Sequence, residues 1–189
     1  MKKNTWIILG SIAAVVLILI FWYVSVYNGL IRMNEEVNGK WAQVETQYQR
    51  RVDLIPNLVA TVQGAANFES STLEEITRLR SQWQAAGSVN EKITTANQIE
   101  STLSRLLLVS ENYPQLQATK NFQSLQDELS NTENKVAVER ARFNEAVKAF
   151  NARIKTFPSN MVAGSLGYVD REYFEAQAGS DVAPQISFA

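Results

Sequence analysis

An uncharged apolar run near the N-terminus, from Trp6 to Val24, constrains this chain more than any other feature. As an α-helix the run would be about 28 Å long, which matches the roughly 30 Å hydrocarbon core of a bilayer. A helix satisfies its own backbone polar groups in lipid, whereas an open strand does not. We therefore expect the run to cross a membrane once.

Aromatic residues lie at both ends of the run, as is typical of rings at the headgroup level. Trp6 is at one end, and the other end carries Phe21, Trp22, Tyr23 and Tyr27. A cleaved signal peptide fits less well, because the run exceeds the usual apolar length of about 7–15 residues and no small-residue cleavage site follows it. A buried core helix also fits less well, because no face of the run is polar.

The basic residues around the run mildly favour a cytoplasmic N-terminus. Lys2 and Lys3 precede the run, whereas Arg32 and Lys40 follow it at a greater distance. We expect the chain to lie in a bacterial cytoplasmic membrane, with the rest of the protein on the outer side.

Composition limits the chemistry of the rest of the chain. After the apolar run roughly 160 residues remain, which is enough for one domain with a sizeable core. The chain has 18 Lys and Arg against 19 Asp and Glu and no basic stretch, so we expect no nucleic-acid partner. It has no cysteine and no histidine, which excludes disulfides, zinc sites with nitrogen or sulfur ligands, cysteine nucleophiles and imidazole bases. We expect no catalytic, cofactor-binding or metal-binding residues.

Beyond the run, apolar residues recur at steps of three and four, the pattern of long helices with one apolar stripe. Capping boxes at Ser71 and Ser88 predict two further helix starts, and the clearest heptad pattern predicts a helix from Asn121 to about Thr156. The first stripe contains Val37, Trp41, Val44, Tyr48, Arg51, Ile55, Leu58, Val62 and Ala65. The pattern predicts an all-α protein: a transmembrane anchor in residues 1–27 and a long antiparallel up-and-down bundle of three or four helices in residues 28–157.

Three interruptions punctuate this pattern. Pro56 lies within the first stripe, which continues in phase on both sides, so we expect a kinked helix. The sequence leaves open whether Ala85–Asn90 is a loop or a local break in one helix. Residues 158–189 form a tail that is not a helix of any length; we expect its aromatic residues to pack on one end of the bundle and its last residues to be mobile.

Polar residues occupy some stripe positions and are candidates for a contact between helices. Arg51 and Glu139 fall where an apolar side chain would pack, and Glu133 lies beside the stripe of its helix. An ion pair between Arg51 and either glutamate would set the register of two long helices without adding stability.

Two features bear on self-association. Gly10 and Ala14 form a small-xxx-small spacing that would let two membrane helices approach closely. An exposed heptad seam on the bundle would serve the same purpose. We expect a homo-oligomer.

The chain resembles the LemA family over most of its length. The resemblance lies in Tyr27-Asn-Gly-Leu30, the string Arg50-Arg-Val-Asp-Leu-Ile-Pro-Asn-Leu58, Glu111-Asn-Tyr-Pro114 and Phe157-Pro-Ser-Asn160. It implies a membrane-anchored helical bundle with no established enzymatic activity, cofactor or substrate, and descriptions of the family often place its body in the cytoplasm.

These observations favour a non-enzymatic protein whose helical body is a scaffold or interaction module of the cell envelope. The partners we expect are the lipid bilayer, further copies of the chain and another membrane protein. The alternative is an extracytoplasmic sensor that signals through a partner protein, because helical bundles transmit small helix shifts through membrane helices.

Overall fold

The computed structural model describes residues 2–64 and 70–174, and it confirms the all-α prediction. This part of the chain contains six helices and no strand. Four of the helices are long: α1 (Lys2–Gln63), α2 (Ser70–Ala85), α3 (Val89–Ser110) and α5 (Lys120–Lys155). Two are short: α4 (Pro114–Gln117) and α6 (Ser159–Ser165).

The chain divides into two compact units. Unit 1 consists of Met1–Lys40 and Phe143–Glu172, and unit 2 consists of Trp41–Arg142 and Tyr173–Ala189. The helices α1 and α5 contribute residues to both units. The boundaries predicted for the anchor, bundle and tail follow hydropathy along the chain, whereas these units group segments that lie far apart in it.

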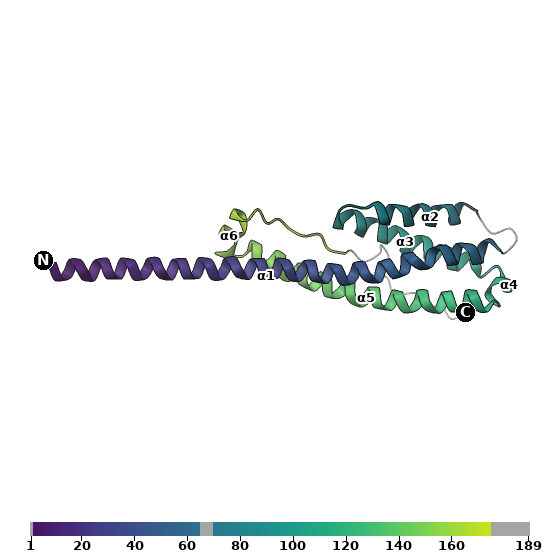
Figure 1. Ribbon diagram of the computed structural model, residues 1–189, viewed down its shortest axis with the longest axis horizontal. Helices are drawn as coiled ribbons and strands as arrows, with labels where there is room; N and C mark the ends of the chain where they lie inside the picture. Colours follow the sequence, from purple (N-terminus) through teal and green to yellow (C-terminus); the bar gives the residue numbers. More distant parts are fainter. Residues whose placement is uncertain (1, 65–69, 175–189) are drawn as a thin grey trace, which may run out of the picture. The chain divides into compact units, whose positions relative to one another are not determined.

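In unit 2 the helices run alternately up and down, and α4 forms the connection between α3 and α5 (Figure 1). The contacts between α2 and α3 form a helical hairpin. Its connection settles the open question about Ala85–Asn90, because α2 ends at Ala85 and α3 begins at Val89. Ser88 is the N-cap of α3, and its side chain and that of Glu91 form the predicted capping box.

The core of unit 2 is built from the stripes that the sequence predicts. On α1 every described member of the stripe from Trp41 to Val62 is buried, including Arg51. On α5 the buried residues in this unit include Phe122, Leu129, Thr132 and Val136. Side chains at steps of three and four share one helix face, so each helix buries one side and exposes the other.

The helix α1 continues through Pro56, which is exposed. Proline has no N–H and therefore removes one backbone hydrogen bond within the helix, the one to the carbonyl four residues earlier. Val52 and Ile55 before the proline and Leu58 after it are all buried, so the apolar stripe keeps its phase across this position. The kink predicted at Pro56 stays a prediction.

Unit 1 contains the first part of α1, the last part of α5, and α6. Residues 6–25 of α1 are exposed, and the first buried side chains after them are Val26 and Leu30. Figure 1 shows α6 and the end of α5 beside this later part of α1. Ile154, Val162 and Ala163 provide buried apolar surface on these two elements.

The tail departs from the expectation in two respects. It includes the seven-residue helix α6, which lacks a strong sequence signal because three of its residues are Ser, Gly and Ser. Of its aromatic residues Phe174 is buried and Tyr168 packs edge-on against Phe150, but Tyr173 remains 44% exposed. The residues predicted to be mobile, beyond Ala178, lie outside the described part of the chain.

Candidate functional site

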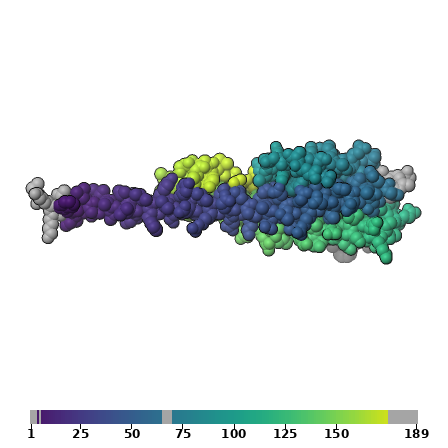
Figure 2. Space-filling model, in the orientation of Figure 1, coloured from purple at the N-terminus to yellow at the C-terminus, as the bar shows by residue number. Residues whose placement is uncertain are grey.

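The exposed part of α1 is the first candidate site. None of its described side chains from Trp6 to Ser25 is buried, and an 18-residue window within this helix has a mean hydropathy of 2.8. By length and composition it is the one described helix that could cross a membrane. Figure 2 shows the segment, in purple, without other elements packed over it.

The predicted interface aromatics lie at the two ends of this segment. Trp6 and Phe21 are strongly exposed, and Trp22 and Tyr23 are also exposed. The rings of Tyr23 and Tyr27 stack with their centroids 6.2 Å apart. Exposure in water is costly for such rings, whereas at the headgroup level they gain from an apolar body and a polar edge.

Gly10 and Ala14, the candidate contact between membrane helices, are both exposed on α1. A Cβ added at Gly10 would meet no atom within 4 Å. The glycine is therefore not required by packing within a single copy of the chain.

The structure places Arg51 beside Glu133 in unit 2. Arg51 Nη2 lies 3.6 Å from Glu133 Oε2, and the side chain of Arg51 is 3% exposed against 63% for Glu133. Arg51 Nη1 also donates to the carbonyl of Leu129, at 3.5 Å. Glu139 pairs with Arg142 on its own helix, where Arg142 Nη1 donates to Glu139 Oε1 at 2.7 Å. Between the two glutamates that the sequence offers to Arg51, the contact is with Glu133.

A buried polar cluster in unit 2 was not predicted from the sequence. The Tyr48 hydroxyl donates to Glu100 Oε1 at 2.6 Å, and Arg140 Nη1 donates to Glu100 Oε2 at 3.1 Å. Burial raises the pKa of the Tyr48 hydroxyl well above its usual range, and the negative charge of Glu100 raises this pKa further. Tyr48 therefore remains a proton donor to Glu100, and the cluster links α1, α3 and α5.

Aromatic rings surround this polar cluster. The ring of Phe174 stacks on Tyr48 with a centroid distance of 5.7 Å and on Trp41 at 6.4 Å. The guanidinium carbon of Arg140 lies 4.1 Å from the centroid of the Phe174 ring. On its other side Tyr48 contacts Trp83 at 5.3 Å. Phe174 thus covers the Arg140–Glu100 pair with an apolar and polarizable surface.

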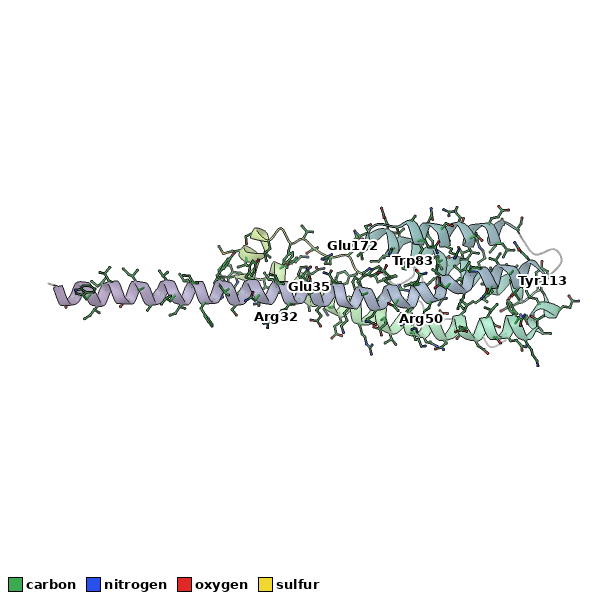
Figure 3. The ribbon with its side chains drawn as sticks, in the orientation of Figure 1. Arg32, Glu35, Arg50, Trp83, Tyr113 and Glu172 are labelled. Carbon is green, nitrogen blue, oxygen red and sulfur yellow. The ribbon has the colours of Figure 1, made fainter. Side chains whose placement is uncertain are left out.

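Trp83 ties the α2–α3 hairpin to α1. Its indole Nε1–H donates to Gln49 Oε1 at 3.2 Å, and the ammonium of Lys92 lies 5.4 Å from its ring centroid. Lys92 also pairs with Glu45 on α1. Figure 3 labels Trp83 where it lies among the helices of this unit.

Sequence reasoning missed the cluster because Glu100 lies at helical spacing from the apolar residues Ala96 and Leu103, but its partners do not share its helix. Arg140 falls next to a stripe position and reads as a solvated charge. Phe174 lies in the tail, and no spacing rule connects it with Tyr48 or Arg140. The available signal was the glutamate within an otherwise apolar stripe, because a buried carboxylate needs a partner.

A cavity of about 580 Å³ lies in unit 2 where α1 ends and α4 begins. Its walls include Thr61, Gly64, Tyr113, Leu116 and Asn121. The phenol of Tyr113 is the one titratable side chain among the described residues that line it, and no carboxylate or amine side chain joins it there. Among the described residues, no group of three or more aspartates or glutamates is placed to hold a metal ion.

Comparison with known proteins identifies the class of protein that these features define. The model of the LemA family matches residues 40–188, and this chain belongs to that family. Its relatives include Protein LemA of Metamycoplasma hominis, which is 28% identical over 157 residues, covering 82% of this chain and 72% of the relative.

Two further relatives carry a different description. Magnetosome protein MamQ 2 of Paramagnetospirillum magneticum and Magnetosome protein MamQ of Magnetospirillum gryphiswaldense are each 25% identical over 189 residues. In both cases the match covers 85% of this chain and 70% of the relative. The chain is therefore a LemA-family helical protein with an apolar N-terminal helix.

Proposed function

We propose that this protein is a single-pass membrane protein whose helical body acts by contact, as a scaffold or interaction module of the cell envelope. The observation that carries the proposal is the change along α1. Its side chains from Trp6 to Ser25 are exposed and almost entirely apolar, whereas from Val26 onward the same helix has a buried side, which includes Val26, Leu30, Val37 and Trp41. Lipid is the environment in which such a segment is stable.

The anchor is tested by extracting membranes from cells that make the full chain. The protein is expected to remain with the membrane in alkaline carbonate and to be released by detergent. A matched variant that carries Leu17→Lys and Ile12→Lys is expected to be released by carbonate, because each charge at the centre of a span costs about 3 kcal/mol. Release of the unaltered chain by carbonate would contradict the anchor.

We also propose that the body lies outside the cytoplasm, on the charge asymmetry of Lys2 and Lys3. Family descriptions favour the opposite side. Protease added to intact spheroplasts is expected to degrade the body, while a cytoplasmic control protein survives. Protection of the body until the spheroplasts are lysed would place it in the cytoplasm.

The scaffold role is supported by the chemistry that the chain offers. The chain has no histidine or cysteine, and the described residues that line the cavity at the end of α1 include no carboxylate or amine side chain. The test is extraction in a gentle detergent, followed by mass measurement and identification of co-purifying proteins. A homo-oligomer or a stable partner is expected, whereas a monomer without companions would argue against a scaffold.

One observation favours a second candidate, a sensor that acts through a partner protein. The helix α1 is continuous from the apolar segment to Gln63, so displacement of one part would move the other. Insertion of Gly-Gly-Ser between Val24 and Ser25 would uncouple the two parts and leave the anchor and the body intact. A scaffold is expected to tolerate this insertion, and a sensor is expected to lose its function.

A further inference from the structure

The corner between α5 and α6 exposes two large apolar side chains within one turn. Phe157 is 76% exposed and Met161 is 67% exposed. The N–H of Asn160 donates to the carbonyl of Thr156 at 3.0 Å, and the N–H of Met161 donates to the carbonyl of Pro158 at 3.3 Å. These bonds close the corner between α5, which ends at Lys155, and α6, which begins at Ser159, so Phe157 and Met161 are exposed four positions apart in one short corner.

This corner belongs to the same compact unit as the apolar segment of α1. Val26 and Leu30 are the first buried residues after that segment, and residues 143–172 are the part of unit 1 that is available to cover them. Figure 1 shows α6 and the end of α5 beside this part of α1. Val26 lies only about 3 Å along the helix axis from Val24, where the apolar run ends. The corner therefore lies close to the level at which α1 would leave the lipid.

Basic side chains near the corner also suit a position at the membrane surface. The last turn of α5 carries Arg153 and Lys155, both exposed. Lys155 pairs with Asp170 at 2.5 Å, and among the described residues no carboxylate forms an ion pair with Arg153. Exposed basic residues beside exposed Phe or Met are the composition of segments that bind at the surface of anionic membranes.

We propose that the α5–α6 corner, residues 156–161, is a second membrane contact. It inserts Phe157 and Met161 into the interface of the bilayer that α1 crosses, on the side where α1 leaves the lipid. The inference rests on the proposed membrane anchor and adds a specific surface to it. The contact fixes the rotation and tilt of unit 1 in the membrane, because one helix alone leaves both free.

An exposed apolar side chain does not by itself indicate a membrane contact, as a residue of unit 2 illustrates. Leu108 of unit 2 is 64% exposed, and single exposed apolar side chains of this kind are normal. The pair at the corner differs because two large side chains share one turn next to the end of an apolar span and next to basic residues. Burial of the apolar side chains in lipid and attraction of the basic side chains to anionic headgroups would both favour binding of the corner to the membrane.

The chain has no cysteine, so single-cysteine variants of the full-length protein carry a spin label at one site only. We would label L17C, F157C, M161C and L108C, reconstitute each in vesicles of phosphatidylethanolamine and phosphatidylglycerol, and measure collision rates with oxygen and with a water-soluble nickel complex. Leu17 and Leu108 are matched controls, exposed leucines of the apolar segment and of unit 2.

The ratio of oxygen to nickel collisions is expected to be several-fold higher at 157 and 161 than at 108, and highest at 17. If the ratios at 157 and 161 equal that at 108 while 17 reports lipid, the corner does not touch the membrane and the anchor stands. If 17 also equals 108, the proposed membrane function itself is wrong. Circular dichroism of each labelled variant verifies that the helices are retained.

Discussion

At the scale of single residues, two arginines in unit 2 illustrate different uses of a buried charge. Arg140 meets Glu100 directly, and both side chains are largely buried. Arg51 is more deeply buried, but its partner Glu133 extends into solvent, and Arg51 Nε has no hydrogen-bond partner in the structure. We therefore expect the two residues to respond differently to replacement by methionine, which has no charge.

Replacement of Arg140 by methionine is expected to destabilise the protein by about 3 kcal/mol, because it leaves the Glu100 carboxylate buried with only the Tyr48 hydroxyl. Guanidinium unfolding in detergent, followed by circular dichroism, measures this change. The double variant R140M/E100M removes both charges and is expected to recover most of the loss. Equal losses in the single and double variants would contradict an ion pair as the cause.

Replacement of Arg51 by methionine is expected to change the free energy of unfolding by less than about 1 kcal/mol in either direction. The charge that is removed is the buried one, and Glu133 remains solvated, so no uncompensated charge is left behind. The same unfolding experiment applies, with E133Q as the control for the exposed partner. A loss above about 3 kcal/mol would show that Arg51 is essential to a buried network. If Arg51 sets helix register, broader NMR signals are expected in R51M without loss of helix.

At the scale of helices and segments, the start of α3 depends on one carboxylate. Glu91 accepts from the backbone N–H groups of Gly87 and Ser88, at 2.9 and 3.2 Å. These hydrogen bonds lower the pKa of Glu91 below its usual value of 4.5. A carboxyl whose pKa is lowered by folding stabilises the folded state above its usual pKa, and this contribution is lost as the pH falls through the lowered value.

The variant E91Q tests this prediction. At pH 7 the variant is expected to melt at a lower temperature than the unaltered protein, and the difference is expected to shrink as the pH falls below 4.5. Thermal melts at several pH values measure the difference. E111Q is a suitable control, since Glu111 is at the opposite end of the same helix, at its C-cap. A difference that is independent of pH would contradict the cap as its source.

The end of the described tail packs on other aromatic residues of unit 2 through the ring of Phe174. Phe174 is buried against Tyr48 and Trp41, whereas its neighbour Tyr173 is 44% exposed. Replacement of Phe174 by alanine is expected to release this segment, so trypsin should cleave after Arg171 faster than in the unaltered protein. Y173A is the matched control and is expected to leave the rate unchanged. Equal rates in F174A and the unaltered protein would show that the ring does not hold the tail.

At the scale of the whole molecule, the apolar segment of α1 offers a surface through which two copies of the chain could associate. Gly10 provides a test of association through the membrane segment, because a larger side chain there meets nothing within its own chain. The variant G10L is expected to fold normally and to weaken self-association several-fold if small residues bring two anchors together. Mass measurement in detergent at several concentrations tests this. The same oligomer in both proteins would place the contact elsewhere.

The sequence by itself determined the helical class, the apolar segment and the buried stripe of α1. These features depend on local periodicity: side chains at steps of three and four share a face, and a long uncharged run requires lipid or a core. The capping box at Ser88 was equally visible, because its partners lie three residues apart.

Only the tertiary structure decided which distant residues meet. Glu133 and Glu139 were equivalent partners for Arg51 in the sequence, and a rotation of about 100° per residue along α5 directs the first toward Arg51 and leaves the second to Arg142. The contact of Phe174 with Tyr48 and Arg140 joins residues that no helical period relates. Such contacts depend on how helices and tail pack in three dimensions, and a pattern along one helix carries no information about its neighbours.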